Sequence, residues 1–71
     1  MICLWDSDYL FVAEFNTIKL IDLKKDIIVK WLSGHKKDVN NIKDIVHPNY
    51  GKCLLSQDCD GILLWINKNN K

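Results

Sequence analysis

The sequence predicts an all-β protein built from two adjacent antiparallel sheets. Apolar residues make up 48% of its 71 residues. They form short clusters rich in Ile, Leu, Val, Phe and Trp, which polar segments interrupt at intervals of roughly eight to twelve positions, a rhythm typical of strands joined by turns. The chain also repeats itself: Tyr9–Asp22 aligns without a gap on Cys53–Ile66 at an offset of 44 positions, which places Leu10 on Leu54. Two copies of one unit predict two similar sheets.

Four strands are expected in residues 1–33, which form the first unit. Turn-like segments at Asp6–Asp8, Phe15–Asn16 and Lys24–Asp26 separate the apolar clusters. The strands between these turns are expected at Ile2–Trp5, Tyr9–Glu14, Thr17–Leu23 and Ile27–Leu32. Consecutive strands joined by short turns pair as antiparallel hairpins, so the four form one sheet.

The polar stretch Ser33–Asp38 is the natural crossing to a second sheet. After it, apolar residues at positions 39, 42, 45 and 46 have helical spacing, so Val39–Val46 fits a helix when it is considered in isolation. The repeat on either side favours a strand. We therefore expect a strand over Val39–Val46 and keep the helix as the alternative.

Residues 34–67 form the second unit. Pro48–Gly51 is a turn signal, and further strands are expected at Lys52–Gln57 and Ile62–Asn67. Residues 68–71 are wholly polar and are expected to be a tail, so that the second unit lacks an outer strand.

Charge and hydropathy exclude several classes of partner. Ten basic and nine acidic side chains give a net charge of +1, which is too small to attract a phosphate backbone, so nucleic acid is not an expected partner. No apolar run approaches the roughly 18 residues that cross a bilayer. Asp6 and Asp8 stand where a secretion signal would carry basic residues, and no membrane partner is expected.

The three cysteines indicate a reducing environment. Cys3, Cys53 and Cys59 are odd in number and have no C-x-x-C spacing. Small secreted folds use even, dense sets of cysteines, so these residues are expected to be free thiols in a cytoplasmic or other intracellular protein. The spacing predicts no metal site and no cofactor.

A further pattern lies in the second unit. Gly34 and His35 are followed by Trp65, 30 residues after the histidine, and Asp60 and Gly61 stand just before this tryptophan. The spacing resembles one blade of a WD-repeat β-propeller. The offset of 44 falls within the roughly 40–45-residue blade period of that architecture. The resemblance covers nearly the whole chain.

This resemblance implies an incomplete propeller fragment of about one and three-quarter blades. The first, degenerate blade would occupy 1–33, and the second, without its outer strand, 34–67. Repeats of this kind bury apolar faces against their neighbours, and about three are needed for a stable stack. We therefore expect the isolated chain to self-associate or to need further blades.

The resemblance also implies a buried network of hydrogen bonds. In WD-repeat proteins a histidine before the blade, a serine on the second strand, an aspartate in the next turn and a tryptophan on the third strand are joined together. The aspartate position, six residues before Trp65, is here Cys59, and Asp58 and Asp60 flank it, so either carboxylate is a candidate. The expected structural network is His35, Ser56, Asp60 and Trp65.

Catalysis is not expected. Ser56, His35 and Asp60 are formally a Ser/His/Asp set, in which a base would activate a nucleophile within hydrogen-bond reach. In a blade, however, Ser56 is interior and out of reach of a substrate. A single histidine without further ligands also predicts no metal site.

The function that the resemblance implies is a non-catalytic scaffold that binds other proteins. Such propellers do so through loops on the faces of a ring of roughly four to eight blades. Two alternatives stay open: a segment that positions the substrate of a multidomain enzyme, and a truncated product without independent activity. Lys24–Lys25 and Lys36–Lys37 are expected to be solvated turns, and Trp31 has no assigned place.

Overall fold

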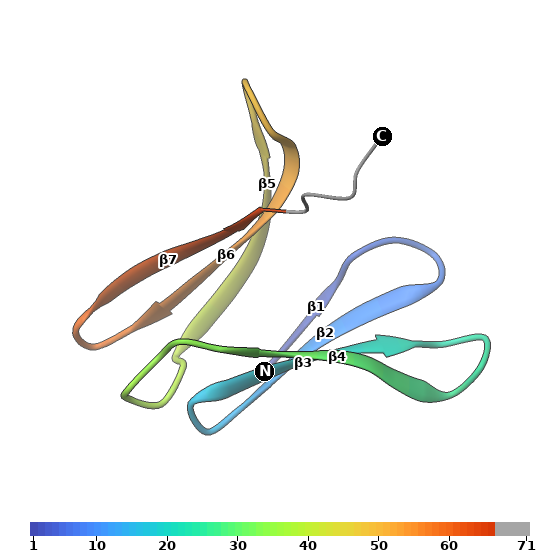
Figure 1. Cartoon of the computed structure of the whole chain (residues 1–71), viewed down its shortest axis with the longest axis horizontal. Helices are drawn as coiled ribbons and strands as arrows, with labels where there is room; N and C mark the ends of the chain where they lie inside the picture. Colours follow the sequence, from blue (N-terminus) through green and yellow to red (C-terminus); the bar gives the residue numbers. More distant parts are fainter. Residues whose placement is uncertain (67–71) are drawn as a thin grey trace.

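The computed structural model describes residues 1–66, which form seven strands in two antiparallel sheets and no helix (Figure 1). The expected all-β class with two antiparallel sheets is therefore confirmed. The strand order is β1-β2-β3-β4 in the first sheet and β5-β6-β7 in the second. The strands are β1 Ile2–Leu4, β2 Tyr9–Glu14, β3 Thr17–Asp22, β4 Ile27–Ser33, β5 Asn41–His47, β6 Gly51–Asp58 and β7 Gly61–Ile66. Asn67 and the expected tail at 68–71 lie outside the described residues.

Aspartate side chains close three of the turns. In each case one carboxylate oxygen accepts the backbone N–H groups two and three residues ahead. The distances are 2.8 and 3.1 Å at Asp6, 2.9 and 3.1 Å at Asp22, and 2.7 and 2.9 Å at Asp58. This is the Asx turn, which explains why the sequence changes direction at these residues.

The strand expected over Val39–Val46, for which a helix was the alternative, is the strand β5, Asn41–His47. It pairs with β6 along its whole length, from Asn41 opposite Gln57 to His47 opposite Gly51. This ladder uses the backbone hydrogen-bonding groups that a helix would otherwise pair internally. The apolar spacing does not mark one helical face, because Ile42 is buried while Val46 is 82% exposed.

The β2–β3 and β6–β7 hairpins are the same structural unit. The bounds of β3 and β7 differ by the 44 positions of the sequence repeat. Their registers match as well, since the end pairs Tyr9↔Asp22 and Cys53↔Ile66 are related by the same offset. The first strand of each sheet does not follow the repeat, because β1 leads into β2 through residues 5–8 and β5 leads into β6 through residues 48–50.

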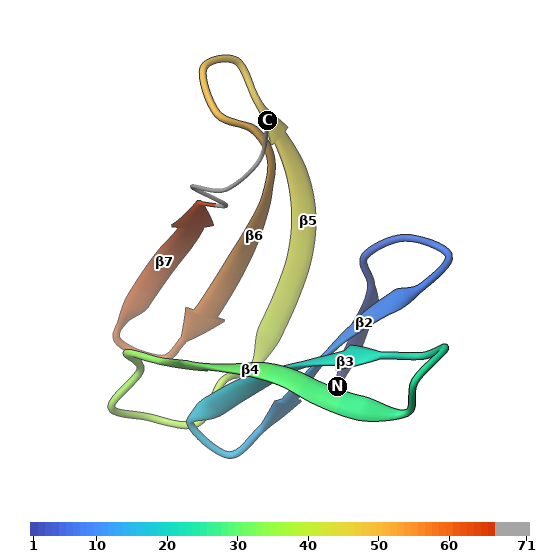
Figure 2. The same ribbon diagram turned by 45° about the vertical axis from the view of Figure 1, so that its right-hand side comes forward.

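The core lies where one face of each sheet meets the other (Figure 2). Its buried members are Phe11 and Ile18 from the first sheet and Ile42 and Leu54 from the second. Burying side chains of this size stabilises a fold by about 1.5–3 kcal/mol each. The partly buried residues packed around them are Cys3, Trp5, Ala13, Leu20, Leu32, Val39 and Trp65.

Polar contacts add to this packing between the sheets. The Val39 N–H donates to the Phe15 carbonyl at 2.8 Å, and Phe15 has a φ of 56°, a conformation that costs a non-glycine residue about 1–2 kcal/mol. Lys52 Nζ donates to the carbonyl of Trp5 and lies 4.6 Å from the centroid of its ring. The turns of one sheet are thus anchored to the chain of the other.

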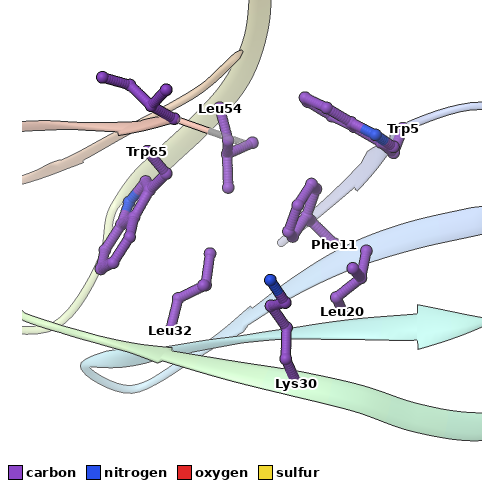
Figure 3. A pocket seen from close by; sticks show the side chains of 8 residues that line it. Trp5, Phe11, Leu20, Lys30, Leu32, Leu54 and Trp65 are labelled. Atoms are coloured by element: carbon purple, nitrogen blue, oxygen red, sulfur yellow. The ribbon is translucent and has the colours of Figure 1, made fainter. Parts of the chain in front are cut away.

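The sheets diverge beyond the core and leave a cavity of about 100 Å³ between them (Figure 3). Side chains from both sheets point toward one another across it, and among residues 1–66 Lys30 is the only charged residue that lines it. The lining residues are Trp5, Phe11, Leu20, Lys30, Leu32, Leu54, Trp65 and Ile66.

Among residues 1–66, no helix is long and apolar enough to cross a membrane.

Candidate functional site

Three of the four expected network residues meet in the second sheet, beside the connection from β4 to β5. His35 lies in that connection, Ser56 on β6 and Trp65 on β7. Ser56 Oγ lies 2.6 Å from His35 Nε2 and 2.7 Å from Trp65 Nε1. Ser56 therefore bridges the imidazole and the indole, whose ring centroids are 6.5 Å apart.

The carboxylate of the network is Asp58, and the expectation for Asp60 is wrong. His35 Nδ1 lies 2.5 Å from Asp58 Oδ2. Asp58 follows Ser56 by two positions on β6, so both side chains point to the same face of the sheet. Asp60 lies in the turn after β6, is exposed, and donates its backbone N–H to Asp58 Oδ1. The alternation of a strand is the signal that identifies Asp58.

The donor groups determine where the protons lie. Trp65 Nε1–H is only a donor, so Ser56 Oγ accepts from it. The Ser56 hydroxyl then donates to His35 Nε2, and His35 Nδ1–H donates to Asp58. With a neutral imidazole and an ionised carboxylate, every polar side-chain atom of this chain of hydrogen bonds has a partner. We call the chain from Trp65 through Ser56 and His35 to Asp58 the relay. Within residues 1–66, no buried side-chain nitrogen or oxygen lacks a hydrogen-bond partner.

The electrostatics of Asp58 follow from these contacts. The hydrogen bond from His35 holds the pKa of the Asp58 carboxyl below its usual range, and the backbone N–H groups of Asp60 and Gly61 act in the same direction. Desolvation opposes them. The ionised form is favoured because three donors point at one carboxylate.

Gly34 lets the connection pass close to Trp65. A Cβ atom at Gly34 would lie 3.2 Å from Trp65 Cη2 and 3.2 Å from Leu63 Cδ1, which is tighter than most carbon contacts. Because Gly34 has no side chain, the backbone can pass directly over the indole of Trp65. This path brings His35 next to Ser56. At Gly61, in the β6–β7 turn, a Cβ atom would meet nothing within 4 Å.

The geometry of Ser56, His35 and Asp58 resembles that of a Ser/His/Asp triad, but Ser56 is inaccessible. Its exposed fraction is 0%, and the Trp65 indole N–H already occupies its oxygen. A nucleophile must meet its substrate at bonding distance. These side chains hold the connection in place instead. Residues 1–66 contain no group of three His, Cys, Asp or Glu side chains placed to hold a metal ion.

The first sheet carries no equivalent network. At the same offset, Val12 stands in place of Ser56, Ile21 in place of Trp65 and Glu14 in place of Asp58. Glu14 instead pairs with Lys19 at 3.3 Å on the surface. The polar relay is thus particular to the second sheet.

The exposed side of the network is a hollow of about 220 Å³. It lies where the β4–β5 connection meets the β6–β7 turn, and its charged rim includes Lys36 and Asp60, both exposed. The lining residues are Gly34, His35, Lys36, Asp58, Asp60, Gly61, Ile62 and Leu63.

Comparisons of the chain with protein-family models, with curated proteins and with solved structures gave no match.

Proposed function

We propose that the chain consists of two successive blades of the WD-repeat type and acts as a non-catalytic scaffold that binds other proteins. Two structural features support the proposal: the hairpin register repeats at 44 positions, and the relay joins the side chains that the resemblance assigns to a blade, with Asp58 as its carboxylate. The relay is the observation on which the proposal chiefly rests.

The relay makes the β4–β5 connection a firm platform for contacts. His35 is 6% exposed and bonded on both ring nitrogens, while Lys36, Lys37 and Asp38 directly after it are exposed. Loops held by a rigid scaffold are the usual places for binding residues, because little ordering is needed when a partner docks. The hollow beside Lys36 offers a seat for a partner's side chain.

The partner's chemistry follows from this rim. Lys36 lines the hollow, the exposed Lys37 follows it directly in the chain, and Asp60 adds one carboxylate to the lining. A protein segment with an acidic side chain for the lysines and a short apolar side chain for the hollow, against Ile62 and Leu63, fits this arrangement.

Affinity capture with the full 71-residue chain as bait tests the proposal. The double substitution Lys36→Glu and Lys37→Glu should weaken a captured partner's binding at least tenfold, since it reverses the charge of the platform. The double substitution Lys24→Glu and Lys25→Glu is the matched control. It makes the same change in charge in the turn at the other end of β4 and should leave binding unchanged.

Equal capture by the two double variants and the unmodified chain would count against this contact surface. Equal loss in both variants would indicate a non-specific effect of charge.

A further inference from the structure

The contact between the two sheets uses a different face of each. We call the face of the first sheet that meets the second its forward face; its core residues are Phe11, Ile18 and Leu20. We call the face of the second sheet that meets the first its rear face, which carries Leu54 and Trp65. The internal interface therefore joins a forward face to a rear face.

The sequence repeat relates these faces to the two outward ones. At an offset of 44, the forward residues Phe11, Ile18 and Leu20 correspond to Leu55, Ile62 and Leu64 of the second sheet. Since the register of the two hairpins is the same and side chains alternate along a strand, these three residues lie on the second sheet's forward face. It faces away from the first sheet.

The rear face of the first sheet follows by the same correspondence. Leu54 and Trp65 correspond to Leu10 and Ile21. The cross-strand pairs Leu4↔Leu10, Ile2↔Val12 and Lys19↔Trp31 extend this face over the other strands of the sheet.

Both outward faces carry exposed apolar side chains. On the forward face of the second sheet, Ile62 is 58% exposed and Leu64 is 38% exposed. On the rear face of the first sheet, Ile2 is 66% and Trp31 is 55% exposed, and Lys19 lies 5.5 Å from the Trp31 ring. Contiguous apolar surface of this kind marks an interaction site.

We infer that these two faces bind each other between copies of this chain: the forward face of one molecule's second sheet docks on the rear face of the next molecule's first sheet. The internal interface is the precedent, because it joins the corresponding faces of the same repeat unit. The association is head to tail, so each added copy leaves one forward and one rear face available. The inference goes beyond the proposed scaffold function and needs only the internal repeat.

Trp31 acquires a role in this arrangement. It is a large exposed aromatic on the last strand of the first sheet and lies on the rear face through its pairing with Lys19. Aromatic side chains of this size are typical anchors at protein interfaces. A second copy would cover it.

Sedimentation velocity of the full chain, with one substitution on each face, tests the inference. Ile62→Lys blocks the forward face of the second sheet and Trp31→Lys the rear face of the first. The unmodified chain should form dimers and larger species. Each variant alone should sediment as a monomer, with association weakened at least tenfold.

Sedimentation of an equimolar mixture of the two variants is the decisive experiment. The Ile62→Lys chain keeps its rear face and the Trp31→Lys chain keeps its forward face, so the mixture should form a dimer and nothing larger. A mixture that stays monomeric, an unmodified chain that is monomeric, or variants that associate like the unmodified chain would each overturn the inference.

Val46→Lys is the matched control. Val46 is 82% exposed and lies on neither outward face, so this variant should associate like the unmodified chain. Loss of association in this variant would contradict the assigned contact.

Hydroxyl-radical footprinting of the unmodified chain gives the same answer without a substitution, should a lysine variant fail to fold. Protection of Trp31 and Ile62, but not of Val46, should increase with protein concentration. Equal or absent protection at the three residues would refute the contact. Ile62 also lines the hollow beside Lys36, whereas Trp31 does not, so the Trp31→Lys arm and the footprint at Trp31 test self-association separately from the proposed scaffold function.

Discussion

The imidazole of His35 and the carboxylate of Asp58, 23 positions apart in the chain, lie 2.5 Å from each other in the buried part of the second sheet. This contact fastens the connection from the first sheet to the hairpin of the second. It also decides which of two neighbouring aspartates is structural, with consequences for stability that can be measured.

Asp58→Asn is expected to lower the midpoint of urea unfolding, whereas Asp60→Asn is expected to leave it unchanged. The Asp58 carboxylate accepts hydrogen bonds from His35 and from the backbone N–H groups of Asp60 and Gly61. An amide at this position has one oxygen and no charge, so it accepts fewer and weaker hydrogen bonds. The exposed Asp60 contributes a backbone N–H, which the substitution preserves. A lower midpoint for the Asp60 variant alone would reverse the assignment.

Acid is expected to destabilise the fold through Asp58. The pKa of this carboxyl is lowered in the folded state, so the folded state binds fewer protons than the unfolded state near its unfolded pKa of about 3.9. The contribution is therefore complete above about pH 4 and is lost as the pH falls through the lower, folded value. Urea melts between about pH 2 and 6 should show this dependence, and Asp58→Asn should flatten it. An equally steep profile in the variant would assign the acid sensitivity to another group.

Ser56→Ala should lower the free energy of unfolding by about 1–3 kcal/mol. It removes the acceptor of the Trp65 indole N–H and the donor to His35 Nε2, so two buried polar groups lose their partner. Ser33→Ala, which removes an exposed hydroxyl at the end of β4, is the control and should change the free energy by less than about 0.5 kcal/mol. Comparable effects of the two substitutions would show that the relay contributes little.

Gly34→Ala and Gly61→Ala form a matched pair. The added methyl group at Gly34 would lie 3.2 Å from both Leu63 and Trp65, so we expect a cost of about 1–3 kcal/mol from overpacking. The methyl group at Gly61 has open space. Thermal melts of both variants should show a loss at position 34 that is clearly greater than that at position 61. A greater loss at position 61 would contradict the close approach.

The thiols should react in a fixed order with a disulfide reagent under native conditions. Cys59 is exposed and should react first, but more slowly than a free cysteine, since desolvation and the carboxylates of Asp60 and Asp58 raise the pKa of its thiol. Cys53 has an exposed fraction of 0% and should react only after unfolding. Mass spectrometry of labelled peptides distinguishes the two, and early labelling of Cys53 would show that the second sheet opens.

The strands were predictable because local patterns are strong in this chain. The expected strand Tyr9–Glu14 has the bounds of β2, and aspartates mark the turns after β1, β3 and β6. Most other strand ends differ from the expected ones by one or two positions. The larger ambiguity was Val39–Val46, whose apolar spacing also suits a helix and which only pairing with β6 resolves.

The candidate site was predictable in part. The resemblance to a WD-repeat blade selected His35, Ser56 and Trp65, whereas the choice between Asp58 and Asp60 needed the direction of each side chain. Ser56 and Asp58 share a face of β6, and Asp60 lies beyond the end of that strand. A count of residues back from the tryptophan does not contain this information.

The amino-acid sequence by itself determined the class of this protein, its turns and its internal repeat, because alternation of apolar side chains and Asx turns act over a few neighbouring residues. Tertiary structure excluded the helical alternative for β5, and it alone decided that Asp58 completes the relay and that Trp31 and Ile62 lie on opposite outward faces. These outcomes depend on residues far apart in the chain, which only the packing of the two sheets brings together.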